Sequence, residues 1–253
     1  MKKLAKGGPA EQKGSASGRF RGNPAPYPRI IEEMEASNRR ASSPPLRTRP
    51  LPRQALPMGQ RAEQVRNATY ADLEAVPSHK VAEIIHGTLH VMPRPAPRHA
   101  RASSRLGGEL MGPFDRGRGG PGGWQILDEP ELHFLNPAVK AGKDVLVPDL
   151  AGWRVERMPD LPEEAYFSLA PDWICEVLSE STEEVDREEK MAIYAREGVQ
   201  HAWLVDPIAR MLEVFRLDGR GWERDGVYRE DARVSAEPFQ ALELELSALW
   251  VNR

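Results

Sequence analysis

Two carboxylates stand inside apolar runs of the sequence, where an acidic side chain is unusual. Asp149 lies within Val145–Leu150 (VLVPDL), and Glu176 lies within Trp173–Leu178 (WICEVL). A carboxylate in a buried strand costs several kcal/mol unless it is paired or bound to a metal ion. One such acid is usually a strand end or a satisfied pair, but two of them, with Glu83 as a third candidate, favour a shared site. Magnesium prefers oxygen ligands and is commonly held by one or two carboxylates, so the pattern is typical of a magnesium site.

A lysine follows Glu176 on a predicted helix that spans about Thr182–Glu197. Ser181 and Glu184 have the spacing of a capping box at its start. Lys190 comes four residues after Asp186 and shares a helix face with it. A solvated lysine is the ordinary outcome at such a position. The alternative is an ammonium that points back to the preceding strand, where it could orient an attacking water and stabilise developing negative charge. The spacing leaves both open.

The elements that must position these groups alternate between helices and strands. We expect a short helix at Tyr70–Val76, a hairpin at Ala82–Met92 that turns at His86-Gly87, a helix at Pro97–Phe114, a flexible loop at Arg116–Gly123, strands at Gln125–Leu127, Glu131–Leu135, Val145–Trp153 and Ile174–Leu178, the helix at Thr182–Glu197 ended by Gly198, and strands at His201–Val205, at Met211–Leu217 and near Trp222. This order indicates an α/β or α+β domain with a central mixed sheet flanked by helices.

The charge of the 253-residue chain is divided unevenly. Residues 1–62 hold 13 basic and four acidic residues, a net of +9, together with nine of the 23 prolines. The remainder holds 22 basic and 34 acidic residues, a net of −12. The basic, proline-rich front predicts a disordered tail, followed by one domain over residues 63–253. Two alternatives stay open: the front is an arm that binds nucleic acid electrostatically, or the natural chain starts at Met58.

A net of −12 argues against simple binding of DNA, because DNA-binding domains normally have a basic footprint. A local counterweight is offered by Arg94, Arg98, Arg101 and Arg105, the last three on one side of the predicted helix. Contact with phosphate groups and ordinary solvation are both open for these arginines. His99, on the same helix, has the same two interpretations.

Two further features concern the compartment. The N-terminal residues have the charge of a secretory signal but no apolar segment behind it, and no stretch approaches the ~18 apolar residues of a membrane span. The single cysteine, Cys175, excludes an intramolecular disulfide and any cysteine-based zinc site. We therefore expect a soluble cytoplasmic protein that does not associate with membranes.

Several short motifs follow one another in a fixed order. They are Glu83–Leu89 (EIIHGTL), Met92-Pro93 with Pro97-Arg98-His99, Val147–Leu150 (VPDL), Pro171–Ser179 (PDWICEVLS), Ser181-Thr182, Asp186-Arg187 with Lys190, Tyr194-Ala195 with Gly198-Val199, and Trp203–Pro207 (WLVDP). In this order they closely resemble the Uma-two family of bacterial endonucleases, which have the restriction-endonuclease-like PD-(D/E)xK fold. The resemblance covers roughly residues 70–249.

The resemblance implies a metal-dependent endonuclease that hydrolyses phosphodiester bonds of DNA with Mg²⁺ or Mn²⁺. Asp149 would be the acid of the PD motif, Glu176 the acid of the second motif, and Glu83 the early acid of the first hairpin. Metal ligands would come from these three acids and from the backbone carbonyl of Val177.

The lysine of the superfamily pattern is displaced in this chain. Two residues after Glu176, where that lysine would share the strand face, the sequence has Leu178. The resemblance nominates Lys190 on the following helix instead, as the group that aids the attacking water.

Other functions and assemblies stay open at this point. A degenerate nuclease fold could act as a binding module, and a hydrolase of a small nucleotide phosphoester would suit the acidic domain better. A homodimer is expected only by analogy, since many nucleases of this fold pair to cut both strands.

Overall fold

The computed structural model describes residues 63–250, so the tail and the domain boundary predicted around residue 62 lie outside the described residues. Its elements in chain order are β1 (Glu63–Arg66), α1 (Tyr70–Glu74), β2 (Lys80–Ile85), β3 (Thr88–Pro93), α2 (Pro97–Leu110), η1 (Met111–Asp115), β4 (Trp124–Asp128), β5 (Leu132–Leu135), β6 (Lys143–Leu146), β7 (Leu150–Arg154), β8 (Trp173–Val177), η2 (Val185–Lys190), α3 (Met191–Arg196), β9 (His201–Asp206), β10 (Met211–Asp218), β11 (Gly221–Arg229), β12 (Arg233–Val234), β13 (Leu244–Glu245) and η3 (Leu246–Ala248).

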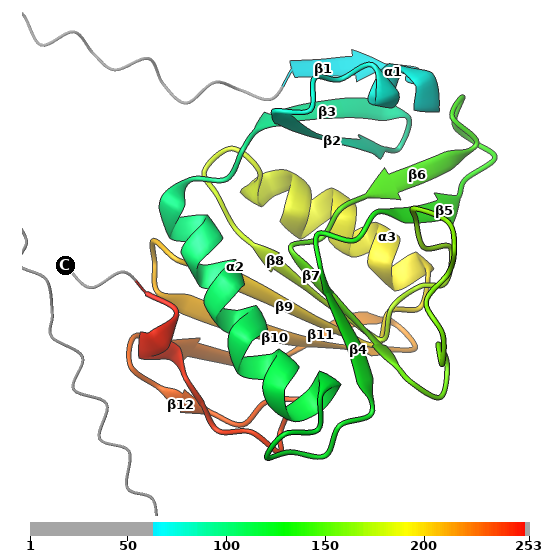
Figure 1. The fold of residues 1–253 in the computed structure, drawn as a ribbon. Coiled ribbons are helices and arrows are strands. Elements are labelled where there is room, and N and C mark those ends of the chain that lie inside the picture. Colours follow the sequence, from blue (N-terminus) through cyan, green and yellow to red (C-terminus); the bar gives the residue numbers. More distant parts are fainter. Residues whose placement is uncertain (1–62, 251–253) are drawn as a thin grey trace, which may run out of the picture. The chain divides into compact units, whose positions relative to one another are not determined.

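The strands form two larger sheets and a small pair (Figure 1). One sheet has the order β1-β3-β2-β6-β5, the second has the order β11-β10-β9-β8-β7-β4, and β12 pairs with β13. In the six-stranded sheet β8 and β9 are parallel and the other neighbours antiparallel. A parallel pair needs a crossover, and η2 with α3 supplies it. The predicted mixed sheet flanked by helices is confirmed.

The first hairpin joins β2 to β3 at the predicted turn. His86 and Gly87 both have positive φ angles, 49° and 78°. Two-residue turns of this left-handed type match the twist of the flanking strands, and glycine adopts the conformation without strain. The turn fixes the register that sets Glu83 opposite His90.

The strand predicted over Val145–Trp153 is wrong as a single element. The chain leaves β6 at Leu146 and enters β7 at Leu150, and these two strands belong to different sheets. Pro148 lies in the break and has no N–H group to continue a ladder of hydrogen bonds. Asp149 therefore lies at a crossing between two sheets, not inside an interior strand.

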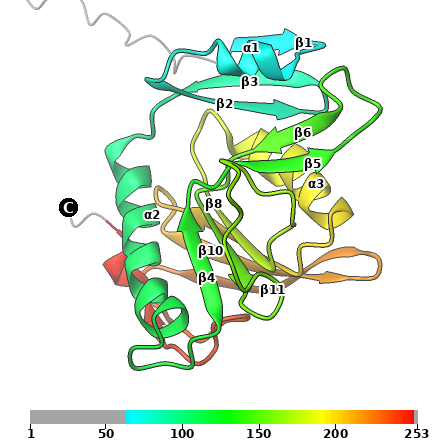
Figure 2. The same ribbon diagram turned by 45° about the vertical axis from the view of Figure 1, so that its right-hand side comes forward.

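The alternation of side chains along β8 separates the two main cores. Trp173, Cys175 and Val177 pack in the core beneath α2, whereas Ile174 packs in the core beneath α3. Because successive strand residues face opposite sides, Glu176 shares the α3 side with Ile174. In both ribbon views α3 lies beside β5 and β6 of the other sheet (Figures 1 and 2).

The predicted helix over Thr182–Glu197 is confirmed in position and corrected in detail. Its middle, η2, is a π-helix, and α3 continues it. The capping box expected from Ser181 and Glu184 does not form; instead Ser179 lies at the start, with its Oγ 2.9 Å from Thr182 Oγ1 and its carbonyl accepting from the Thr182 and Glu183 N–H groups.

The helix ends as predicted at Gly198, which has a φ of 78°. The following N–H, of Val199, donates to the Tyr194 carbonyl. This arrangement is the common glycine-based end of a helix.

Among residues 63–250, no helix is both long and apolar enough to span a membrane.

Candidate active site

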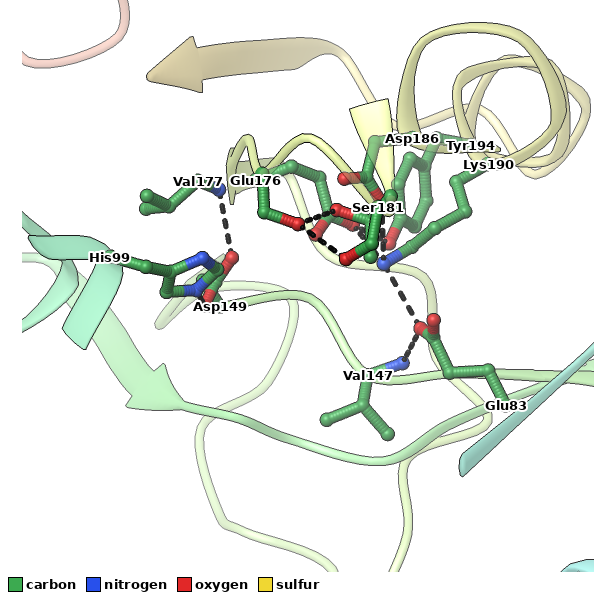
Figure 3. Close-up of polar contacts among 12 residues, drawn as sticks. Glu83, His99, Val147, Asp149, Glu176, Val177, Ser181, Asp186, Lys190 and Tyr194 are labelled. Carbon is green, nitrogen blue, oxygen red and sulfur yellow. Dashed lines mark hydrogen bonds and ion pairs between the residues drawn. The ribbon is translucent and has the colours of Figure 1, made fainter. Parts of the chain in front are cut away.

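Asp149 is the first of four carboxylates that the fold brings together (Figure 3). Its Oδ2 accepts a 2.8 Å hydrogen bond from the Val177 N–H at the end of β8. Its Oδ1 lies 2.5 Å from His99 Nε2, which comes from the first turn of α2. Since a carboxylate only accepts hydrogen bonds, Nε2 of His99 carries the proton. Asp149 is thus oriented by one backbone group and one side chain.

Glu176 is the second carboxylate, and the side chain is almost fully buried. Its Oε1 accepts a 2.5 Å hydrogen bond from the Tyr194 hydroxyl on α3 and lies 2.8 Å from Lys190 Nζ. Burial and the Glu176 carboxylate raise the pKa of Tyr194 well above its usual value, so its hydroxyl stays protonated and donates. The strand thus presents Glu176 with one oxygen held by two donors.

Glu83 and Asp186 complete the set. Glu83 Oε1, from β2, accepts a 2.7 Å hydrogen bond from the Val147 N–H and lies 3.0 Å from Lys190 Nζ. Asp186 Oδ1, one turn before Lys190 on η2, lies 3.4 Å from the same nitrogen. Lys190 therefore faces three carboxylates. Of the two interpretations from the sequence, it matches the lysine that points back to the preceding strand, and not the solvated helix lysine.

Four carboxylates against one lysine leave a surplus of negative charge. Burial raises the pKa of Glu176 well above its usual range; Lys190 opposes this rise, and the neighbouring acids add to it. Burial likewise raises the pKa of Asp186 to about 6, again opposed by Lys190. Burial alone lowers the pKa of Lys190, but the carboxylates of Glu176 and Glu83 outweigh it and place that pKa well above its usual value. Lys190 is therefore charged, while Glu176 and Asp186 hold a proton more readily than exposed acids do, because they are buried and the site holds four acidic side chains but a single lysine.

The π-helical turn η2 is what delivers Lys190 and Asp186 to the site. π-helical turns are rare and occur often at functional sites. This one is anchored from outside by Arg187, whose guanidinium lies 2.6 Å from Glu213 on β10 and 2.8 Å from Glu183. Glu213 is itself buried and also pairs with Arg224 on β11. Arg187 thus links the turn to β10, while Lys190 of the same turn contacts Glu176 of β8.

A cavity of about 220 Å³ opens beside these groups. Its polar lining residues are Glu83, Arg94, His99, Glu129, Asp149, Glu176, Ser179, Ser181, Thr182, Asp186 and Lys190. Val177 also borders it. A small molecule or one phosphate group of a chain could therefore meet both sequence-predicted acids at once.

The donor set suits an oxygen-loving divalent cation. Asp149 and Glu176 border the same cavity, and the surplus negative charge around them is what a divalent cation offsets. Between residues 63 and 250 no group of three or more His, Cys, Asp or Glu side chains is arranged as a metal cluster. The fit is therefore that of a two-carboxylate site completed by water or substrate, a common arrangement for magnesium.

The predicted phosphate-binding residues separate into three groups. Arg94 and His99 line the cavity; Arg94 donates to the Ser78 carbonyl and lies 4.0 Å from Glu129. Arg98 and Arg105 are exposed on α2. Arg101 instead donates its Nε–H to the Trp250 carbonyl, 3.2 Å away, which makes it a link to the C-terminal segment.

Two residues of the site had no role assigned from the sequence. Asp186 was placed beside Lys190 only by helix spacing, and Tyr194 belonged to a motif without a function. The i, i+4 and i, i+8 spacing of Asp186, Lys190 and Tyr194 gives one helical face and is the signal that groups them.

Comparisons with known proteins bear on the family and the fold of the chain. Residues 68–248 match the model of the Uma2 family, the Uma-two family that the motifs resemble, which is described as "Putative restriction endonuclease". A crystal structure from Anabaena variabilis ATCC 29413, described as "a putative nuclease belonging to DUF820", is similar with a TM-score of 0.57 and 23% identity, over 72% of this chain and 97% of that one. No curated protein matches the chain. At this identity the solved structure supports the fold.

Proposed function

Because the chain belongs to the Uma2 family, we propose that it is a metal-dependent nuclease that hydrolyses phosphodiester bonds of DNA. One observation carries the proposal. Asp149 and Glu176, from separate strands, border the same cavity, and Lys190 lies 2.8 Å from Glu176. These are the residues that the family resemblance nominates for the chemistry.

Asp149 and Glu176 would hold a Mg²⁺ or Mn²⁺ ion, with the Val177 carbonyl and Glu83 as the further ligands that the resemblance suggests. When bound, such an ion polarises a phosphate and lowers the pKa of a bound water. The protein contributes the orientation of both acids: the Val177 N–H and His99 fix Asp149, and Tyr194 and Lys190 fix Glu176. Fixed donors of this kind keep metal ligands in a productive position.

The basic side chains that line the cavity include Lys190 and His99. The Lys190 ammonium provides a permanent positive charge there. Negative charge that develops on a phosphate in this cavity would be stabilised by this charge.

Contact with longer DNA would depend on the exposed arginines near the cavity. Arg94 lines its edge, and Arg98 and Arg105 are exposed on α2. The remaining domain is acidic, so we expect weak, salt-sensitive binding. A homodimer that cuts both strands stays a prediction by analogy.

Nicking of supercoiled plasmid tests the proposal. We expect the wild type to nick plasmid with Mg²⁺ or Mn²⁺ and to stop in EDTA, and Asp149→Asn and Glu176→Gln to fall to background. Glu245→Gln, an exposed acid paired with Arg233 far along the chain, is the matched control and should nick normally. Nicking that survives EDTA, or equal nicking by all variants, would overturn the assignment.

A second function is favoured by the charge of the domain. Residues 63–253 carry a net of −12 and the cavity holds about 220 Å³, which suits a small nucleotide phosphoester better than a duplex. It predicts metal-dependent turnover of a small phosphodiester such as bis(4-nitrophenyl) phosphate with the plasmid left intact. A binding module without catalysis would leave both substrates unchanged.

A further inference from the structure

Lys190 has surroundings that differ from those of a lysine poised to hold a water. Its Nζ lies 3.0 Å from Glu83 Oε1, 2.8 Å from Glu176 Oε1 and 3.4 Å from Asp186 Oδ1, and its side chain is only 3% exposed. An ammonium has three N–H donors. Three carboxylates from three different elements therefore converge on one small cation (Figure 3).

The carboxylates around Lys190 are held in place by the protein itself. The oxygen of Glu176 that faces the ammonium also accepts from Tyr194, and the oxygen of Glu83 that faces it also accepts from the Val147 N–H. Each of these two oxygens thus has two donors already. These two oxygens are directed toward Lys190 rather than toward a bound ligand.

Asp149 differs from the other three acids. The contacts of its two oxygens are with His99 and the Val177 N–H, and Lys190 is not among its ion-pair partners. The set of acids therefore divides into three that surround the ammonium and one on the α2 side of the cavity. Glu176 connects the two parts of the site, since it contacts Lys190 and also borders the cavity with Asp149.

We propose that the Lys190 ammonium is a built-in cation in the position that a second divalent ion would need, between Glu83, Glu176 and Asp186. The site then binds a single divalent ion, on the Asp149 side of Glu176. A second ion would have to displace a buried ammonium of the same charge sign from its three partners. This inference rests on the proposed metal-dependent function and deepens it, because it assigns Glu83 and Asp186 to the lysine and not to the metal.

The number of bound ions tests the proposal without any substrate. Mn²⁺ binding to the full chain is measured by isothermal titration and, independently, by loss of the free Mn²⁺ signal in electron paramagnetic resonance. We expect one ion for the wild type, one for Asp186→Asn and none for Asp149→Asn. In Lys190→Met, which keeps the length of the side chain and removes its charge, the vacated position should admit a second ion.

Each other result is informative. Two ions on the wild type would overturn the inference and leave the metal-dependent function standing, as would the loss of the single ion in Asp186→Asn. No ion on the wild type would overturn both. One ion on a folded Lys190→Met would show that the ammonium does not stand in for a cation. Should Lys190→Met fail to fold, the wild type and Asp186→Asn still decide between one ion and two.

Discussion

Removal of the Tyr194 hydroxyl tests a single contact that holds the site together. Tyr194→Phe keeps the buried ring and removes the one donor that lies 2.5 Å from Glu176 Oε1. A hydrogen bond to a charged group contributes about 1.5–3 kcal/mol. Lys190 Nζ stays 2.8 Å from the same oxygen and partly compensates the loss. We therefore expect a decrease of about 1–2 kcal/mol in the free energy of unfolding.

Thermal and urea unfolding in EDTA measure this loss. For a domain of this size, about 1–2 kcal/mol corresponds to a Tm lower by about 2–8 °C. Tyr228→Phe is the matched control, a half-buried tyrosine on β11 away from the site, where we expect a change within about 0.5 kcal/mol. If Tyr194→Phe were as stable as Tyr228→Phe, the Tyr194 hydroxyl would not contribute to holding Glu176 in place.

Three further outcomes follow from the charges around the site. The pKa of Asp186 is about 6 in the folded protein, against an ordinary value of 3.8. Between these pH values the folded state binds more protons than the unfolded state. In EDTA, the free energy of unfolding should therefore fall as the pH rises from about 4 to 6. This decrease is on the order of 1–3 kcal/mol, and Asp186→Asn should remove most of it. Urea unfolding at several pH values measures the change, and the same pH dependence in wild type and variant would contradict this prediction. Arg187→Ala leaves buried Glu213 with one partner and should lower the free energy of unfolding by about 1–3 kcal/mol. If the variant were as stable as the wild type, the ion pair between Arg187 and Glu213 would not stabilise the turn. Arg98→Ala should lower the salt slope of DNA binding by about 1, and Arg101→Ala should not; equal slopes would exclude a phosphate contact at Arg98.

Much of the fold follows from local patterns that the sequence displays. The turn at His86-Gly87, the helix end at Gly198 and the alternation along β8 each depend on residues a few positions apart. Local conformational preferences decide such features, and the predicted turn and helix end are confirmed. The break at Pro148 carried its own signal, because a proline cannot continue a central strand, but the apolar run around it predicted one strand.

The sequence indicates Glu83, Asp149, Glu176 and Lys190 as members of the candidate site, but it assigns no role to Tyr194 and does not indicate the contacts among these residues. Asp149 and Glu176 were identified because charged residues in apolar runs need partners. That Lys190 points toward Glu176 depends on the π-helical turn and on the anchor from Arg187 to Glu213, which joins residues 26 positions apart. Arg101 has the spacing of a phosphate-binding stripe, but it bonds the Trp250 carbonyl, a partner that no local pattern indicates.

Titration of Mn²⁺ into purified protein shows whether Asp149 and Glu176 together form the cation site. We expect saturable binding to the wild type and to the Glu245→Gln control. Glu176→Gln should weaken binding by more than about 100-fold, since even groups that only support a metal ligand contribute about 10–100-fold. Equal affinity of wild type and Glu176→Gln would show that Glu176 is not part of the cation site.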